Sequence, residues 1–394
     1  GLLDVHEEMY RETHVRLHRL LASVEEQSSE FDTAFRWLEQ GMALANNSTR
    51  AELARCYLLG AKIYYRRGDM NEALDWINHS LQITDEQGDI ADRANVLRLK
   101  GVIQSDIGEL GASIHALEEA RAIWEQLHDD ISGKSRILND LGAVYDQMGR
   151  WQEAIACYEQ AIEISESIGD AVGVAYASNN LAYILVGRNE LQRAYDLYVY
   201  SGERFNQIGS AWGIALTDYN RGEVLILQGQ PAAAMQLFQQ SLETFERIGS
   251  RTFIPEVLRL LAEASLALAD YATATAYAQR SIEEADAMGM TLEMGIAQRV
   301  LGQIAVQQHH YVQAAEYLEQ ARTTLEDADS PYDVGKVRYW QAHLAAATNN
   351  LSQAYALLQQ ATQTFTKLDA QRDLANVYEL ATRYHIPLAL SDVA

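Results

Sequence analysis

The chain has 394 residues, 48% of them hydrophobic, and its 31 basic and 55 acidic side chains give a formal charge of −24. This composition excludes a protein that coats DNA or RNA and one that docks on an anionic membrane face, because both need clustered Lys and Arg. The two cysteines, Cys56 and Cys157, are too few for a disulfide framework, and we expect both to be small buried hydrophobes in a reducing cytoplasm.

No membrane or export segment is predicted. The most apolar stretch, Leu258–Ala278, is interrupted by Arg259, Glu263 and Asp270, so no run reaches the roughly 18 apolar residues of a membrane span. The acidic N-terminus is not that of a signal peptide. We therefore expect a cytoplasmic protein, and the first residue, Gly1 rather than Met, predicts a piece of a longer chain.

Three columns of small residues recur with a step of about 40 residues. Helices approach closely only where the contacting side chains are small, so each column predicts a helix–helix contact. The first column is Ala22, Ala61, Gly101, Gly142, Ala182, Gly222, Ala262, Gly302 and Ala342. The second is Ala34, Ala73, Ser113, Ala154, Ala194, Ala234, Ala274, Ala314 and Ala354, and the third is Gly41, Ser80, Ala120, Ala161, Ser201, Ser241, Ser281, Ala321 and Ala361.

Turn residues separate the columns. Gly68 and Asn349 lie between the first and second columns, and Gly88 and Gly169 lie between units. Gly and Asn tolerate the left-handed conformation that closes a helix, so each unit is predicted to be a helix, a tight turn and a second helix. His309 falls in one of these tight turns, which favours a turn role over a ligand role.

The spacing of the small residues, with Tyr145 and Tyr158 on the aromatic positions, resembles the tetratricopeptide repeat over about residues 15–369. Units of about 40 residues resemble those of kinesin light chain, Leu-Gly-Asn-type polarity adaptors, bacterial quorum-peptide receptors and ATPase-linked regulators. The proline that often ends the second helix is missing, so we expect second helices about a turn and a half longer than usual.

The resemblance implies an all-α fold: one right-handed superhelix, an α-solenoid, of nine helix-turn-helix units with a C-terminal capping helix over Gln371–Tyr384. We expect residues 1–394 to form this single solenoid. The units start near residues 15, 54, 94, 135, 175, 215, 255, 295 and 335, and residues 370–394 form the cap and tail.

In the family, the first helix of each pair lines a concave groove that holds a peptide or a partner segment. A basic set is expected there, and inside an acidic shell it would focus an acidic segment. The alternative is that these side chains are merely solvated. The set is Arg55, Lys62, Arg66, Arg98 and Arg136. Later units place Glu256, Arg259, Glu263, Arg299, Gln303, Lys336, Tyr339, Trp340 and His343 at groove positions.

An amide set and an aromatic set share the predicted groove. Asn139, Asn179, Asn180 and Asn220 resemble the Asn ladder by which long-unit arrays hold a peptide backbone, since an amide both donates and accepts. The alternative is that they only tie neighbouring helices together. Tyr176, Tyr183 and Tyr219 are the aromatic set, with ligand contact and seam packing as the two interpretations.

No catalytic motif is found: the sequence has no Walker loop, dinucleotide pattern, nucleophile elbow or zinc-spaced Cys pair. His14 and His18 share a helix face, but the stretch HVRLH lacks the Glu of the zinc-protease motif, so we expect a packed or solvated pair. We predict no catalytic residue, no metal and no cofactor, and hence not an enzyme.

The leading prediction is a non-catalytic protein- or peptide-binding scaffold or sensor, part of a larger bacterial regulator, with no nucleic-acid or membrane partner. One alternative is a peptide receptor whose superhelix changes pitch on ligand binding. Another is self-association into a homo-oligomer through Tyr195, Tyr198 and Tyr200.

Overall fold

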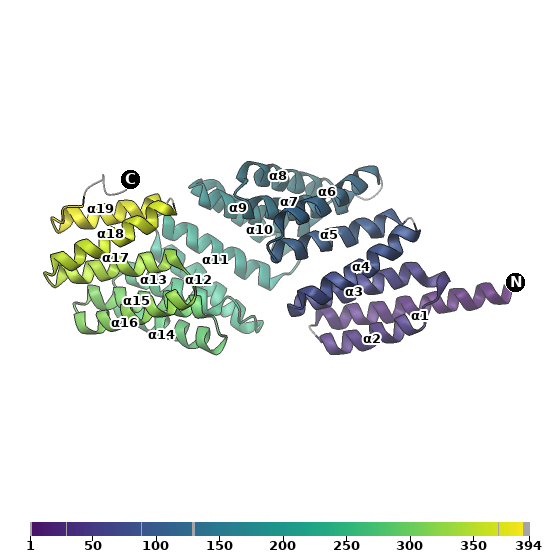
Figure 1. Cartoon of the computed structure of the whole chain (residues 1–394), viewed down its shortest axis with the longest axis horizontal. Helices are drawn as coiled ribbons and strands as arrows, with labels where there is room; N and C mark the ends of the chain where they lie inside the picture. The colour runs from purple at the N-terminus through teal and green to yellow at the C-terminus, as the bar shows by residue number, and fades with distance from the viewer. Residues whose placement is uncertain (1, 29, 88, 128–130, 369, 389–394) are drawn as a thin grey trace. The chain divides into compact units, whose positions relative to one another are not determined.

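Figure 1 shows the computed structural model of the chain, in which residues 2–28, 30–87, 89–127, 131–368 and 370–388 are described. Gly1, Gly88 and residues 389–394 of the predicted tail lie outside them. The described residues form nineteen α-helices and one short 3-10 helix, η1 (Asn47–Thr49), with no strand among them. The predicted all-α repeat fold is confirmed.

The helices come in pairs. The first helices are α1 (Leu2–Gln27), α3 (Arg50–Arg67), α5 (Ile90–Asp106), α7 (Ile131–Gln147), α9 (Ala171–Gly187), α11 (Ala211–Leu227), α13 (Ile254–Ala267), α15 (Thr291–Gln307) and α17 (Pro331–Ala347). The second helices are α2 (Phe31–Ala43), α4 (Met70–Gln87), α6 (Leu110–Gln126), α8 (Trp151–Ser167), α10 (Leu191–Gln207), α12 (Pro231–Arg247), α14 (Tyr271–Ala287), α16 (Tyr311–Asp327) and α18 (Leu351–Lys367). The last helix, α19 (Gln371–Arg383), follows the ninth pair.

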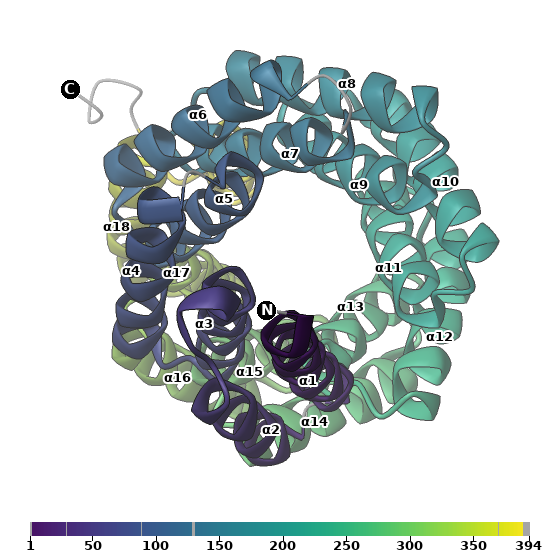
Figure 2. The ribbon, with the colours of Figure 1, turned by 90° about the vertical axis from the view of Figure 1, so that its right-hand side faces the viewer.

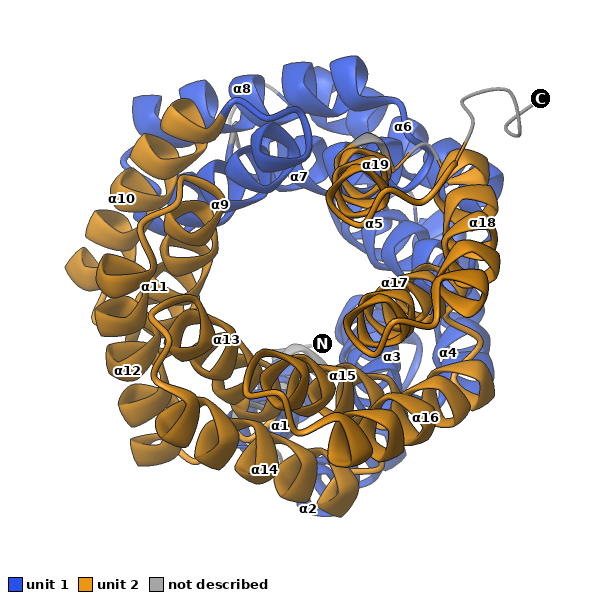
Figure 3. Cartoon of the chain, turned by 90° about the vertical axis from the view of Figure 1, so that its left-hand side faces the viewer, with its two compact units in different colours: residues 1–190 blue, residues 191–394 orange. Residues whose placement is uncertain are grey.

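The helices form two compact units, residues 1–190 and 191–394, which Figure 3 shows in different colours. In unit 1, each first helix from α1 to α7 contacts the next first helix, whereas no two second helices of the described chain contact each other. The first helices therefore form the concave layer of the unit, with α4, α6 and α8 outside α3, α5 and α7 (Figure 2). Unit 2 has the same two layers, with α11, α13, α15 and α17 inside (Figure 3).

The small residues lie in the helix–helix contacts, as predicted. All three columns are buried. A Cβ added to Gly222 would lie 2.5 Å from the Phe238 ring, and one added to Gly142 would lie 2.7 Å from the Tyr158 ring. Ser241 of the third column also donates a hydrogen bond of 2.8 Å to the Ala215 carbonyl oxygen of the first helix. The seam therefore needs small residues on steric grounds.

The predicted tight turns are confirmed, including that of His309. Gly68 and Asn349 have φ of 87° and 61°, in the left-handed region. Ala269 and His309 take the same conformation, with φ of 59° and 62°, although neither is Gly or Asn. Eight of the tight turns within the helix pairs take this conformation, whichever residue occupies it, so the fold imposes it there.

Helix lengths differ from the expectation in one respect. The second helix α12 has 17 residues, but so has its first helix α11. The extra residues of the long unit are therefore shared between both helices. Both cysteines are buried, as expected, and burial raises the pKa of Cys56 to about 12 and that of Cys157 to about 11. Among the described helices, none combines the length and apolar character that a membrane crossing requires.

Candidate functional site

The concave layer of unit 1 contains a hollow of about 750 Å³. Its walls come from α1, α3, α5 and α7, and they include four of the five residues of the predicted basic set. The lining residues are Arg19, Ser23, Arg55, Leu58, Leu59, Lys62, Tyr65, Arg66, Asp92, Asn95, Arg98, Leu99, Val102 and Asp140. The structure therefore brings these four predicted residues together around one hollow, which we call the basic hollow.

Glu52 of α3 is buried at the edge of the basic hollow and holds three arginines. Its carboxylate lies 3.2 Å from Arg16 Nε, 2.9 Å from Arg19 Nε and 2.8 Å from Arg55 Nη1. Burial acts to raise the pKa of Glu52, but hydrogen bonds and positive charge from Arg19 and Arg55 hold it below its ordinary value. One negative charge thus positions three positive ones.

Glu26 of α1 is a second buried carboxylate with several cations. Lys62 Nζ lies 3.2 Å from Glu26 Oε2, and Arg66 Nη1 lies 2.6 Å from Oε1 and 2.5 Å from the Glu26 carbonyl oxygen. Half of the Lys62 side chain remains exposed. These bonds join α3 to α1 and leave the ammonium group accessible from the hollow.

Two aspartates complete the charge pattern. Arg55 Nε lies 2.7 Å from Asp92 on α5, and Arg98 Nη1 lies 2.7 Å from Asp140 on α7. Burial raises the pKa of both Asp92 and Asp140, against the opposing effect of their arginines. With Asp89 at 3.8 Å from Arg55, six cationic side chains meet five carboxylates here. The hollow therefore carries a small positive excess in a chain of charge −24.

The predicted amide set divides between the two units. Asn180 Nδ2 on α9 donates to Asn139 Oδ1 on α7 at 3.1 Å, which ties two neighbouring first helices together, as the structural interpretation expects. Asn179 also lies on α9. Asn220 lies on α11 of unit 2 and is buried.

The remaining predicted site residues lie outside the basic hollow. Arg136 is exposed on α7, where its Nη2 lies 3.4 Å from Ser132 Oγ. Tyr176 and Tyr183 are exposed on α9. The structure places Tyr219 in the core instead, 6% exposed, with its ring centroid 6.5 Å from that of Phe238. Burial of its large aromatic ring between the helices is more favourable than exposure of the ring to solvent.

Sequence reasoning missed Arg19 and both buried glutamates of the basic hollow. Arg19 lies three residues before the small residue Ala22, just as Arg98 lies three residues before Gly101. The same spacing applied to the first unit would have found it. Glu52 does not occupy a predicted groove position. It lies near the start of α3, and its side chain is buried against the arginines.

In the concave layer of unit 2, one arginine is surrounded by several carboxylates, whereas in unit 1 one carboxylate is surrounded by several arginines. Arg259 of α13 is nearly buried and lies 3.5 Å from Glu256, 3.5 Å from Glu263 and 3.0 Å from Glu293. Burial, followed by the charge of Glu256, raises the pKa of Glu223 on α11 to about 7. Three carboxylates here surround Arg259, and only Glu263 also contacts a second arginine of the described chain, Arg299, so this face lacks the cation excess of unit 1.

A hollow of about 470 Å³ lies beside this cluster, between α13, α15, α17 and α19. Arg299 and Lys336 line it, with Arg299 Nη2 3.2 Å from Glu263. Burial and the nearby Arg299 charge lower the pKa of Lys336. Six of the nine groove positions predicted for the later units line this hollow, whereas Glu256, Arg259 and His343 do not.

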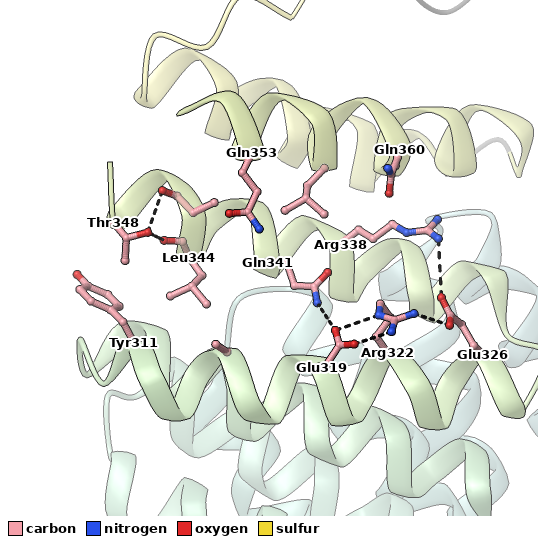
Figure 4. Close-up of a pocket in the computed structure, with 13 residues that line it drawn as sticks. Tyr311, Glu319, Arg322, Glu326, Arg338, Gln341, Leu344, Thr348, Gln353 and Gln360 are labelled. Carbon is pink, nitrogen blue, oxygen red and sulfur yellow. Dashed lines mark hydrogen bonds and ion pairs between the residues drawn. The ribbon is translucent and has the colours of Figure 1, made fainter. Parts of the chain in front are cut away.

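A third hollow, of about 660 Å³, lies on α16, α17 and α18 (Figure 4). Arg322 there lies 2.5 Å from both Glu319 and Glu326, and Gln341 Nε2 lies 3.4 Å from Glu319 (Figure 4). Exposed carboxylates of α16 hold both cations, since Glu326 also lies 3.9 Å from Arg338 Nη2 of α17. Reasoning from the first helices alone did not predict this hollow, because α16 and α18 supply most of its lining.

The fold and these hollows define an all-α repeat protein with polar concave faces. The sequence model of the tetratricopeptide repeat family matches residues 92–167 and 133–199. Together with the helix-pair fold, this match shows that residues 92–199 carry tetratricopeptide repeats.

Three solved structures are similar in fold. The apo form of the quorum sensor NprR from B. thuringiensis has a TM-score of 0.64 and 12% identity, covering 96% of this chain and 98% of that chain. A Rap protein complexed with competence and sporulation factor has a TM-score of 0.54 and 14% identity, covering 95% and 98%. A signal transduction ATPase with numerous domains, with a tetratricopeptide repeat sensor, from Pyrococcus horikoshii has a TM-score of 0.63 and 13% identity, covering 90% and 54%.

At these identities the likeness shows the fold. No curated protein matches the chain.

Proposed function

We propose that this chain is a non-catalytic binding module whose basic hollow in unit 1 holds an acidic, extended segment of a peptide or partner protein. The observation that carries the proposal is Glu52, one buried carboxylate that positions Arg16, Arg19 and Arg55. Arginines held in this way lose little further side-chain freedom when a ligand carboxylate arrives.

The rest of the hollow supports a segment rather than a single ion. It extends over four helices, and Leu58, Leu59, Leu99 and Val102 lie among its charged residues. Apolar side chains of the ligand can be buried there while its carboxylates meet Lys62 and Arg98. The acidic remainder of the chain repels the same ligand, so the field favours the hollow over other surfaces.

We further propose that the array is the sensing or partner-recruiting part of a larger bacterial regulatory protein. The support is the fold shared with a quorum sensor, with a Rap protein in complex with a factor, and with the tetratricopeptide repeat sensor of an ATPase. If the ligand instead changes the pitch of the repeats, scattering shows a smaller radius on binding, whereas a passive scaffold keeps its radius.

The direct test is a titration of the full chain with three labelled peptides of equal length, in which Leu alternates with Glu, Ser or Lys. We expect the Glu peptide to bind most tightly and to weaken as salt is raised. Replacing both Lys62 and Arg98 with Glu should weaken its binding at least tenfold, because both side chains line the hollow.

Arg150→Glu is the matched control, because Arg150 is an exposed arginine of unit 1 outside the hollow that pairs with Glu153. Circular dichroism establishes that each variant is folded. Equal affinity for the three peptides, or equal loss in the control and the double variant, would contradict the proposal.

A further inference from the structure

The first helix, α1, is longer than its counterparts. It has 26 residues where α5 has 17. Ala22 is the twenty-first residue of α1, whereas the equivalent Gly101 is the twelfth of α5. The residues of α1 before Arg11 therefore have no equivalent in the later first helices.

One face of α1 carries a row of exposed apolar side chains. Tyr10, Leu17, Leu20 and Val24 are 65%, 49%, 50% and 61% exposed, and Met9 beside them is 59% exposed. With Thr13, the row has steps of three and four residues, the spacing of a two-helix seam. It lies opposite the buried face of α1, which includes Val15 and Ala22. No other described helix exposes four apolar side chains in such a row.

The same positions are core positions in the other repeats. The equivalents of Leu17 in the next three pairs are Cys56, Val96 and Ile137, and those of Val24 are Ile63, Ile103 and Val144. All six are at most 2% exposed. They lie against the second helix of the preceding pair, as α2 contacts α3 and α4 contacts α5. This face of a repeat is therefore built to be covered by another helix.

The opposite end of the array cannot supply that cover. The exposed side chains of α19 are Arg372, Ala375, Asn376, Glu379, Thr382 and Arg383, which make a polar end as a capping helix should. Stacking head to tail would bury this polar surface against the apolar row of α1. Of the described helices, the one whose exposed face matches the row is α1 itself.

We propose that two copies of this chain pair through α1, antiparallel, about a two-fold axis close to Leu17. Tyr10 and Val24 lie seven residues on either side of Leu17, so Tyr10 meets the partner's Val24 and Leu17 meets the partner's Leu17. The five exposed side chains bury roughly 100 Å² each, hence about 1,000 Å² over both copies, near the lower limit of a specific interface. An isologous contact of this kind closes at two copies.

Sedimentation equilibrium of the full chain over micromolar concentrations tests the pairing. We expect a monomer–dimer equilibrium, at least tenfold weaker dimerisation for Leu17→Glu/Val24→Glu, and no change for Val312→Glu. Val312 is a matched control because it is an apolar side chain 76% exposed on α16. The side chains of Leu17, Val24 and Val312 are all exposed and do not support the core, so circular dichroism should be unchanged. A strictly monomeric wild type, or equal dimerisation of all three proteins, would overturn the proposal.

Cysteine cross-linking tests the antiparallel arrangement, since Cys56 and Cys157 are buried. Under mild oxidation, Leu17→Cys should form a disulfide-linked dimer with itself. Val24→Cys should form one only when mixed with Tyr10→Cys. A Val24→Cys homodimer would show parallel pairing and refute the proposed axis.

Discussion

Arg98 on α5 and Asp140 on α7 are joined by a 2.7 Å ion pair at one end of the basic hollow. Asp140 neutralises a cation that would otherwise face the ligand. Asp140→Asn should therefore bind the alternating Glu–Leu peptide several-fold more tightly, because it removes a competing carboxylate. Fluorescence anisotropy measures the change. Asp146→Asn, on the same helix but outside the hollow, should bind as the wild type does, and weaker binding by Asp140→Asn would count against the proposed site.

The seam glycines predict a paired effect on stability. An added Cβ at Gly222 meets the Phe238 ring at 2.5 Å, whereas at Gly111 on α6 it meets nothing within 4 Å. Gly222→Ala should lower the free energy of unfolding by about 1–3 kcal/mol. Gly111→Ala should raise it by roughly 0.5–1 kcal/mol, because Ala is the better helix former. Urea unfolding measures both, and a neutral Gly222→Ala would show that the seam tolerates a methyl group.

The tight turns predict a stabilising change. Ala269 has φ of 59°, a conformation that costs an L-residue roughly 1–2 kcal/mol and glycine almost nothing. Part of that gain is offset by the greater freedom of glycine in the unfolded chain. Ala269→Gly should stabilise the chain by about 0.5–1 kcal/mol in the same urea experiment. A destabilised variant would mean that the Ala269 methyl group makes contacts that outweigh the strain.

The raised pKa of Glu223 predicts that the stability of the fold depends on pH. Its folded pKa of about 7 lies above the ordinary value of 4.5, so the folded chain binds this proton more tightly than the unfolded chain does. The stability from protonation is fully present below about pH 4.5 and is lost as the pH rises to about 7. Ionised Glu223 then destabilises the fold by up to about 3 kcal/mol.

Glu223→Gln should therefore melt at a higher temperature than the wild type at about pH 8, and at nearly the same temperature at about pH 4.5. Thermal unfolding followed by circular dichroism measures both. If the melting temperatures of the variant and the wild type differ equally at both pH values, the effect arises from packing and not from charge.

Replacing Arg259 should cause a large loss of folding stability. It is the shared cation of Glu256, Glu263 and Glu293, so Arg259→Met leaves three carboxylates without it. We expect the free energy of unfolding to fall by about 3–5 kcal/mol. Arg280→Met, which removes an exposed pair with Glu246, should cost about 1 kcal/mol or less. Similar losses for both variants in urea would show that the Arg259 cluster is no more than a surface network.

The sequence predicts the helix pairs well because steric exclusion acts at fixed positions. Gly142 and Gly222 can be recognised as seam residues without coordinates, since nothing larger fits beside a neighbouring helix. The division of the extra length between both helices was not predicted, because no single residue type marks where a helix without a terminal proline ends.

The site is predicted less completely than the fold. Groove spacing finds Lys62 and Arg98, since their helix faces follow from the repeat. Groove spacing does not find Glu52, because the role of Glu52 depends on Arg16 and Arg19 of a different helix, α1. It also places Tyr219 in the groove, because spacing alone does not show which aromatic ring the core of unit 2 can enclose.

The most direct test of the central claim is to locate a bound acidic segment. A Glu–Leu peptide that carries a photoreactive benzophenone would be cross-linked to the full chain, and the adducts mapped by mass spectrometry. We expect adducts on α1, α3 and α5 around Leu58, Leu59 and Val102, and we expect them to be lost when unlabelled peptide competes. Adducts on the second helices or on unit 2, with none around the basic hollow, would contradict it.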